Sequence, residues 1–130
     1  MLHLSIVVGD LGEAQAFYVD LLDCPPGRLG DGWMDVWFHG LQLTLQEQPE
    51  QVLPHHEQGR RHFGVTLDAD EFAELTARLH ADDGVRWLVP VTTDHQGTPR
   101  QQTKCTIPDP SGNVVELKTY LDLEAALGPR

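Results

Sequence analysis

The sequence predicts an α+β protein made of two similar halves, each running strand, helix, strand, strand, strand. Each half opens with a histidine in an alternating strand, at His3 and His62, 59 positions apart. An Asp-x-x-Glu helix cap follows, beginning at Asp10 in one half and at Asp68 in the other. A helical stripe of apolar residues follows each cap, and the two stripes are 58 positions apart. This self-similarity indicates an internal duplication.

The strands and the helix of the first half are predicted from the spacing of its apolar residues. Residues 2–8 alternate between an apolar and a polar face, which is typical of a strand. Asp10 begins a helix whose apolar stripe continues to Leu21, and the prolines after Cys24 end it. Three further strands are predicted over residues 27–29, 33–39 and 41–46.

The second half repeats this order after a polar linker over residues 47–61 that contains two prolines. A strand over residues 62–67 leads into the helix capped by Asp68 and Glu71, which ends near Gly84. The remaining strands are predicted over residues 85–91, 101–107 and 114–120, with a polar loop over residues 92–100. We therefore divide the chain into a first module, 1–58, and a second module, 59–130, which together form one compact domain.

Composition narrows the possible functions. The net charge of −11 argues against nucleic-acid binding, because a phosphate-binding surface needs clustered Lys and Arg. The first apolar run breaks at Gly9-Asp10, and neither a signal peptide nor a membrane span is recognisable. The two cysteines do not form a disulfide framework and suit a reducing compartment. We expect a cytoplasmic protein that binds neither nucleic acid nor membranes.

Two histidines and one carboxylate stand out on the polar strand faces. Glu116 occupies the middle of a β-rich run, where strands normally avoid Glu, and a solvated outer face is its simplest explanation. If the two sheets curl toward each other, however, His3, His62 and Glu116 line one cleft. Two imidazoles and one carboxylate form the set that holds non-haem Fe(II) with open positions, and Mn(II) or Zn(II) also fits it.

Several segments resemble a known superfamily, and together they span nearly the whole chain. These are the opening from His3 to Leu11, the helix Ala-x-x-Phe-Tyr-x-x-Leu-Leu from Ala14, the restart His62-Phe63-Gly64-Val65, and Asp109-Pro110-Ser111-Gly112-Asn113 followed by Glu116. They resemble the vicinal oxygen chelate superfamily of glyoxalase I, bleomycin and fosfomycin resistance proteins and extradiol dioxygenases. Small predicted extradiol dioxygenases are most similar, through Trp33-Met34-Asp35, Gly40-Leu41-Gln42-Leu43 and the segment 97–103.

The resemblance implies a fold and a metal site. It implies two βαβββ modules whose sheets form an open mixed barrel around a metal-binding cleft. It places the metal ligands at His3, His62 and Glu116, and it places the fourth carboxylate ligand of glyoxalase I at Gln42. Because an amide is a weaker ligand than a carboxylate, this favours the three-ligand dioxygenase pattern over the glyoxalase pattern.

The implied function is a metal-dependent dioxygenase, with ring cleavage of a catechol-type or other bidentate oxygen chelator by O₂. Fe(II) is the expected metal. A glyoxalase-type lyase or isomerase, or a non-catalytic binding and resistance protein, are the alternatives. Related proteins often pair modules across two chains, so we expect a homodimer, and the sequence leaves open whether the site lies within one chain or between two.

Five residues complete the candidate site beside these ligands. Tyr120 lies four positions after Glu116 on the same strand face and is the candidate acid or base, with a packing role as the alternative. Gln42, Asp35, Trp37 and His39 are candidate lining residues of the substrate pocket. A surface position near the Gly40 turn is the simpler explanation for His39, and barrel packing or a dimer contact explains Trp37 equally well.

Overall fold

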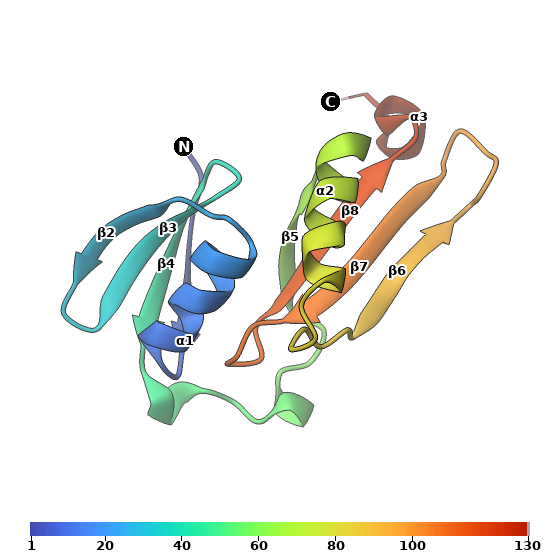
Figure 1. Cartoon of the computed structure of the whole chain (residues 1–130). Helices are drawn as coiled ribbons and strands as arrows, with labels where there is room; N and C mark the ends of the chain where they lie inside the picture. The colour runs from blue at the N-terminus through green and yellow to red at the C-terminus, as the bar shows by residue number, and fades with distance from the viewer. Residues whose placement is uncertain (130) are drawn as a thin grey trace. The chain divides into compact units, whose positions relative to one another are not determined.

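The computed structural model describes residues 1–129 and divides into two compact units (Figure 1). Unit 1 comprises residues 1–61 and the short segment 109–113, and unit 2 comprises residues 62–108 and the chain from Val114 onward. Each unit contains one mixed four-stranded sheet and one principal helix, so the predicted α+β class with two βαβββ modules is confirmed. The closure of the two sheets into one barrel stays a prediction.

Unit 1 has a sheet with the strand order β1-β4-β3-β2, in which β1 runs parallel to β4 and the other neighbours are antiparallel. Its strands are β1 (His3–Val8), β2 (Pro26–Gly30), β3 (Trp33–Phe38) and β4 (Leu41–Glu47). Its helical segments are α1 (Leu11–Gln15), the π-helix η1 (Ala16–Leu21) and the short 3₁₀ turns η2 (Pro49–Gln51) and η3 (His55–Glu57).

Unit 2 repeats this topology with the strand order β5-β8-β7-β6, in which β5 runs parallel to β8. Its strands are β5 (His62–Thr66), β6 (Val89–Asp94), β7 (Gln102–Pro108) and β8 (Val114–Tyr120). Its helices are α2 (Ala69–His80) and the short α3 (Leu123–Leu127).

Both helix starts are capped as their sequences predict. The Asp10 carboxylate accepts from the Glu13 N–H at 2.8 Å, and Asp68 accepts from the Glu71 N–H at the same distance. In α2 the Glu71 side chain also accepts from the Asp68 N–H, which completes a capping box. The first helix covers the predicted range, but its second half winds as a π-helix.

Each unit has an apolar core formed by one face of its sheet and the buried side of its helix. Phe17 and Tyr18 of η1 pack edge to face, with ring centroids 4.9 Å apart. The other buried apolar residues of unit 1 include Val8, Ala14, Leu22, Met34, Val36, Phe38, Leu43 and Leu45. Those of unit 2 are Leu67, Phe72, Leu75, Leu79, Cys105, Ile107, Val115 and Leu117. The strand alternation seen in the sequence therefore separates a core face from a polar face correctly.

The turn over residues 109–113 belongs to unit 1, although it joins two strands of unit 2. The buried Asp109 carboxylate accepts from the Tyr18 hydroxyl at 2.8 Å and from the Asn113 backbone and side-chain N–H groups at 2.9 Å. Ser111 Oγ accepts from the Gly9 N–H at 2.8 Å. Burial, and secondly the charge of Asp109, raises the pKa of the Tyr18 hydroxyl well above its ordinary value, so Tyr18 remains a hydrogen-bond donor.

The strand predicted over residues 85–91 is displaced in the structure. β6 begins at Val89 and continues to Asp94, so the beginning of the predicted loop over 92–100 is strand. Trp87 instead stacks on His80 at the end of α2, with ring centroids 4.6 Å apart. Asp94, in turn, is held to the neighbouring strand by an ion pair with Lys104 at 3.2 Å. Before β6 the chain therefore packs against the helix through Trp87, and its pairing with β7 begins at Leu88, whose N–H donates to the Thr106 carbonyl at 2.9 Å.

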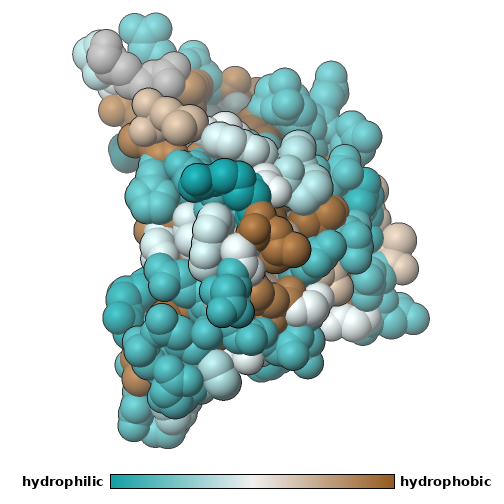
Figure 2. Space-filling view, turned by 90° about the vertical axis from the view of Figure 1, so that its left-hand side faces the viewer, coloured by the Kyte–Doolittle hydropathy of each residue, from teal (hydrophilic) through white to brown (hydrophobic). Residues whose placement is uncertain are grey.

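The surface has the polar character expected from the net charge. Figure 2 shows a face that is mostly hydrophilic and carries only a limited hydrophobic area. None of the helices in the described part of the chain has the length and apolar character that crossing a bilayer requires.

Gly64 allows β5 and β8 to approach closely beside Glu116. A Cβ atom at position 64 would collide with the backbone carbonyl of Glu116, its partner in the parallel pairing. Backbone atoms of a central strand cannot move aside without breaking the ladder, so only glycine fits this position.

We expect Gly64→Ala to destabilise the protein by about 2–4 kcal/mol, because overpacking against backbone forces the strands apart. Urea unfolding followed by circular dichroism measures this change. Gly9→Ala is the matched control, since a Cβ there meets its nearest atoms at 3.6 and 3.7 Å, which is ordinary contact. Equal stability of the two variants would contradict the close approach at Gly64.

Candidate functional site

The parallel pairing of β5 with β8 brings His62 and Glu116 together on the polar face of unit 2. His62 Nε2 lies 3.9 Å from Glu116 Oε2. The Glu116 side chain is 16% exposed and that of His62 is 49% exposed, so an imidazole at the surface lies beside a largely buried carboxylate. The Glu116 carboxylate is therefore partly shielded from solvent, with one of its oxygens beside His62.

Lys118 contacts the other oxygen of the same carboxylate. Its Nζ lies 3.3 Å from Glu116 Oε1 and 5.7 Å from the centroid of the Tyr120 ring. Partial burial alone would lower the pKa of the Lys118 ammonium, but a hydrogen bond and charge from Tyr120 and the charge of Glu116 outweigh it and raise the pKa. Glu116 therefore has one oxygen beside His62 and the other beside a permanent positive charge.

Sequence reasoning did not place Lys118 in the site, although the signal was present. The alternation of β8 puts Glu116, Lys118 and Tyr120 on one strand face, and the structure shows that Lys118 contacts both of the others. Lys104 on β7 is the register partner of Lys118 and pairs with Asp94 at 3.2 Å. The polar face of unit 2 thus carries two neighbouring lysines next to the His62–Glu116 pair.

On unit 1, His3 is exposed on the polar face of the sheet, at the start of β1. It is the register partner of Gln42 on β4, which in turn is the register partner of Trp37 on β3. These three side chains therefore form one row across the sheet. Within residues 1–129, no three His, Cys, Asp or Glu side chains form a group that could hold a metal ion. The candidate ligands thus comprise a pair in unit 2 and one histidine in unit 1.

Asp35 is a buried carboxylate with a complete set of donors. It is 2% exposed, and its Oδ1 accepts from the Thr44 hydroxyl at 2.6 Å. Its Oδ2 accepts from Arg28 Nε at 3.1 Å and from Gln42 Nε2 at 3.2 Å, and Arg28 Nη2 lies 3.0 Å away. Burial alone would raise the pKa of this carboxyl, but the hydrogen bonds from Thr44, Arg28 and Gln42 outweigh it and lower the pKa. Asp35 is therefore a fixed negative charge that orients three donors, Thr44, Arg28 and Gln42, on this face of the sheet.

The strand registers show which residue of the first module corresponds to Glu116. The position two residues after His3 pairs with Thr44, and the position two residues after His62 pairs with Glu116. Thr44, and not Gln42, therefore occupies in the first module the place that Glu116 occupies in the second. The sequence alone did not identify Thr44, because counting from strand ends cannot detect a shift of two residues in pairing.

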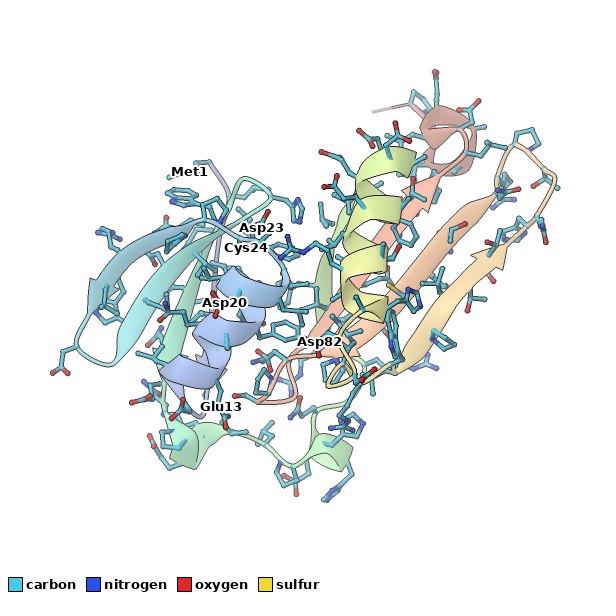
Figure 3. All side chains as sticks on the ribbon, viewed as in Figure 1. Met1, Glu13, Asp20, Asp23, Cys24 and Asp82 are labelled. Atoms are coloured by element: carbon cyan, nitrogen blue, oxygen red, sulfur yellow. The ribbon has the colours of Figure 1, made fainter. Side chains whose placement is uncertain are left out.

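Trp37 and His39 line a shallow cavity of about 240 Å³ at the end of the first helix. Asp23 and Cys24, which follow that helix (Figure 3), also line the cavity. Burial, followed by the charge of Asp23, raises the pKa of the Cys24 thiol to about 12, so this cysteine is not a nucleophile at neutral pH. Cys24 is therefore a wall of the cavity and not a reactive group within it.

The chain was compared with protein families and with known proteins. It matches the model of the Glyoxalase/Bleomycin resistance protein/Dioxygenase superfamily over residues 1–117. A comparison with curated proteins finds no match. Solved structures with a similar fold include a glyoxalase/bleomycin resistance protein/dioxygenase from Alicyclobacillus acidocaldarius, with 26% identity and a TM-score of 0.83 over 98% of this chain and 95% of that one.

Two further structures extend the comparison. The fosfomycin resistance protein FosX from Listeria monocytogenes has 21% identity and a TM-score of 0.77, with 98% of this chain and 97% of that chain covered. The same protein has been crystallised with Mn(II) and sulfate, and that structure gives a TM-score of 0.74 at 21% identity, covering 98% of this chain and 94% of that chain. The family match spans most of the sequence and agrees with the duplicated βαβββ topology. The chain belongs to the Glyoxalase/Bleomycin resistance protein/Dioxygenase superfamily.

Proposed function

We propose that this protein is a metal-dependent enzyme that acts on small bidentate oxygen chelators, with ring cleavage of a catechol by O₂ as the first candidate reaction. His3, His62 and Glu116 are the proposed ligands of one divalent ion. The observation that carries the proposal is the His62–Glu116 pair, in which a largely buried carboxylate lies 3.9 Å from an accessible imidazole. Fe(II) is the proposed metal, and Mn(II) or Zn(II) suits the same donors.

The geometry of the pair fits a metal ion. Ligand atoms bound at about 2.0–2.2 Å to one ion lie roughly 3.0–3.4 Å from each other. His62 Nε2 and Glu116 Oε2 need only a small side-chain movement to reach that separation. Lys118 holds the other carboxylate oxygen at 3.3 Å, so Glu116 is prepared to bind through one oxygen only.

The residues around the ligands suit an anionic oxygen chelator. A divalent ion in this site would supply Lewis acidity and a template for both substrate oxygens. The Lys118 ammonium, beside Glu116, adds a positive charge that attracts a deprotonated hydroxyl group. Tyr120, whose ring lies 5.7 Å from that ammonium, is the proposed group that transfers a proton at the substrate.

A glyoxalase-type reaction is less favoured, because Thr44 occupies the place in the first module that corresponds to Glu116. The Thr44 hydroxyl donates to Asp35 and supplies no fourth carboxylate. A second candidate is fosfomycin resistance, and the neighbouring lysines Lys104 and Lys118 favour it, since two ammonium groups suit a phosphonate. The FosX structures share the fold and make this candidate testable.

Metal binding tests the ligand set. We expect His3→Ala, His62→Ala and Glu116→Gln each to weaken Mn(II) binding by at least about 100-fold, because each removes one of three protein ligands. Electron paramagnetic resonance of free Mn(II) measures the affinity. His55→Ala, in the exposed linker, is the control and should bind like the parent protein. Parent-like affinity of all three ligand variants would contradict the proposed site.

Co-purified mixed dimers show where the third ligand comes from. When a His3→Ala chain pairs with a Glu116→Gln chain, one intact site per dimer is expected if each site takes His3 from one chain and Glu116 from the other. No intact site is expected if all three ligands come from one chain. Mn(II) stoichiometry distinguishes the two arrangements, and size-exclusion chromatography with light scattering tests the proposed homodimer first.

Oxygen consumption tests the reaction. With anaerobically reconstituted Fe(II) protein, we expect one O₂ consumed per catechol, with the reaction abolished by a chelator. Tyr120→Phe should lower kcat by about 10²–10⁴-fold if Tyr120 transfers a proton. An absence of O₂ uptake across a catechol series, together with tight metal-dependent binding of fosfomycin, would replace the first candidate by the second.

The Thr44 position tests whether the buried Asp35 carboxylate excludes a second carboxylate from this place in unit 1. We expect Thr44→Glu to destabilise the protein by about 2–4 kcal/mol at neutral pH, because it sets a second carboxylate against buried Asp35. Repulsion raises the pKa of one carboxyl, so the variant should regain stability as the pH falls from about 7 to about 5. Thr44→Gln is the neutral control, and a Thr44→Glu variant as stable as Thr44→Gln at pH 7 would contradict this account.

A further inference from the structure

We propose that Gln42 is a positioning residue for His3, in that its amide oxygen accepts the N–H of the His3 ring nitrogen that does not bind the metal. This inference rests on the metal-binding role proposed for His3 above. His3 and Gln42 are partners in the parallel pairing of β1 with β4. Their side chains therefore leave neighbouring strands side by side on the polar face of unit 1.

The orientation of the Gln42 amide follows from the chemistry of its neighbour. Gln42 Nε2 lies 3.2 Å from Asp35 Oδ2. An ionised carboxylate only accepts hydrogen bonds, so Gln42 has to turn its NH₂ group toward Asp35. Asp35 stays ionised because Arg28 and Thr44 also donate to it, and its pKa lies below the ordinary value.

The Gln42 amide oxygen consequently points away from Asp35. Among residues 1–129, no hydrogen-bond donor to this oxygen is found. A half-buried amide oxygen with a fixed orientation is an acceptor ready for use by an adjacent group. The neighbour in register is the His3 imidazole.

A metal-binding histidine needs such an acceptor. The ring nitrogen opposite the metal almost always donates its N–H to a carboxylate, carbonyl or water, which fixes the tautomer and the ring orientation. Gln42 supplies a neutral carbonyl at this place, and Asp35 prevents the amide from reversing. The three residues then form a chain of hydrogen bonds from Asp35 through Gln42 to His3, and a glutamate at position 42 would break it by facing Asp35.

Nuclear magnetic resonance of ¹⁵N-histidine-labelled protein tests this role directly. In Zn(II)-loaded parent protein at about pH 8, we expect a His3 ring N–H proton that exchanges slowly with water. In Gln42→Leu the same proton should exchange too fast to be seen, and the Zn(II) affinity should fall by about 10–100-fold. Asp35→Asn should give a smaller loss of the same kind, since an Asn side chain allows the Gln42 amide to reverse.

Gln46→Leu is the matched control. Gln46 lies on the same face of β4 and donates to Ser5 Oγ at 2.6 Å, so its loss should leave the His3 N–H and the Zn(II) affinity unchanged. If Gln42→Leu does not fold, Gln42→Met keeps the side-chain length and removes the acceptor.

The outcomes separate this inference from the proposed function. A parent protein that does not bind Zn(II) overturns the metal site, and the role of Gln42 with it. A parent and a Gln42 variant that bind Zn(II) equally, with equal N–H exchange, overturn the positioning role and leave the metal site standing. A loss in Gln42→Leu and in Gln46→Leu alike would also overturn it, because the effect would then belong to the sheet face as a whole.

Discussion

The parallel pairing of the first and last strands of each module is the constraint on which the rest of the structure depends. β1 pairs with β4 and β5 pairs with β8, although a helix and two strands separate the partners along the chain. This pairing sets His62 close to Glu116 and sets His3 beside Gln42. Gly64 shows how tightly the register is held, since a Cβ there would collide with the backbone of Glu116.

Each module uses the resulting polar face in a different way. In unit 2 the Glu116 carboxylate lies between the His62 imidazole and the Lys118 ammonium. In unit 1 the equivalent place holds Thr44, whose hydroxyl is committed to buried Asp35. The carboxylate of unit 2 is therefore 16% exposed beside an imidazole, whereas that of unit 1, Asp35, is 2% exposed and enclosed by its donors. This asymmetry between the duplicated halves is consistent with the proposed three-ligand site, in which unit 1 contributes a histidine and no carboxylate.

Much of the fold could be predicted from the sequence, because the signals for it are local. The helix caps at Asp10 and Asp68 and the strand alternation depend on neighbouring residues, and both appear in the structure as expected. The start of β6 was misplaced because Trp87 packs on His80 at the end of α2, a contact that the sequence pattern before Val89 does not reveal. The π-helical winding of the first helix likewise has no signature in apolar spacing.

The residue types of the candidate site could be predicted from the sequence, but several of the contacts between its side chains could not. The unusual Glu116 within a β-rich run indicated a functional carboxylate, and the structure places His62 beside it. The alternation of β8 places Lys118 on the same strand face as Glu116, but their contact was recognised only in the structure. The role of Arg28 had no sequence signal, because its carboxylate partner Asp35 lies on the adjacent strand. The correspondence of Thr44 with Glu116 was not recognised from the sequence, because pairing register depends on loop geometry.

X-ray absorption of the Zn(II)-loaded protein at the zinc edge tests the central claim, that two imidazoles and one carboxylate share a single ion, most directly. The account predicts two imidazole groups in the first coordination shell, with the remaining donors oxygen, at about 2.0–2.2 Å. A shell with fewer than two imidazoles, or one that contains sulfur, would contradict it.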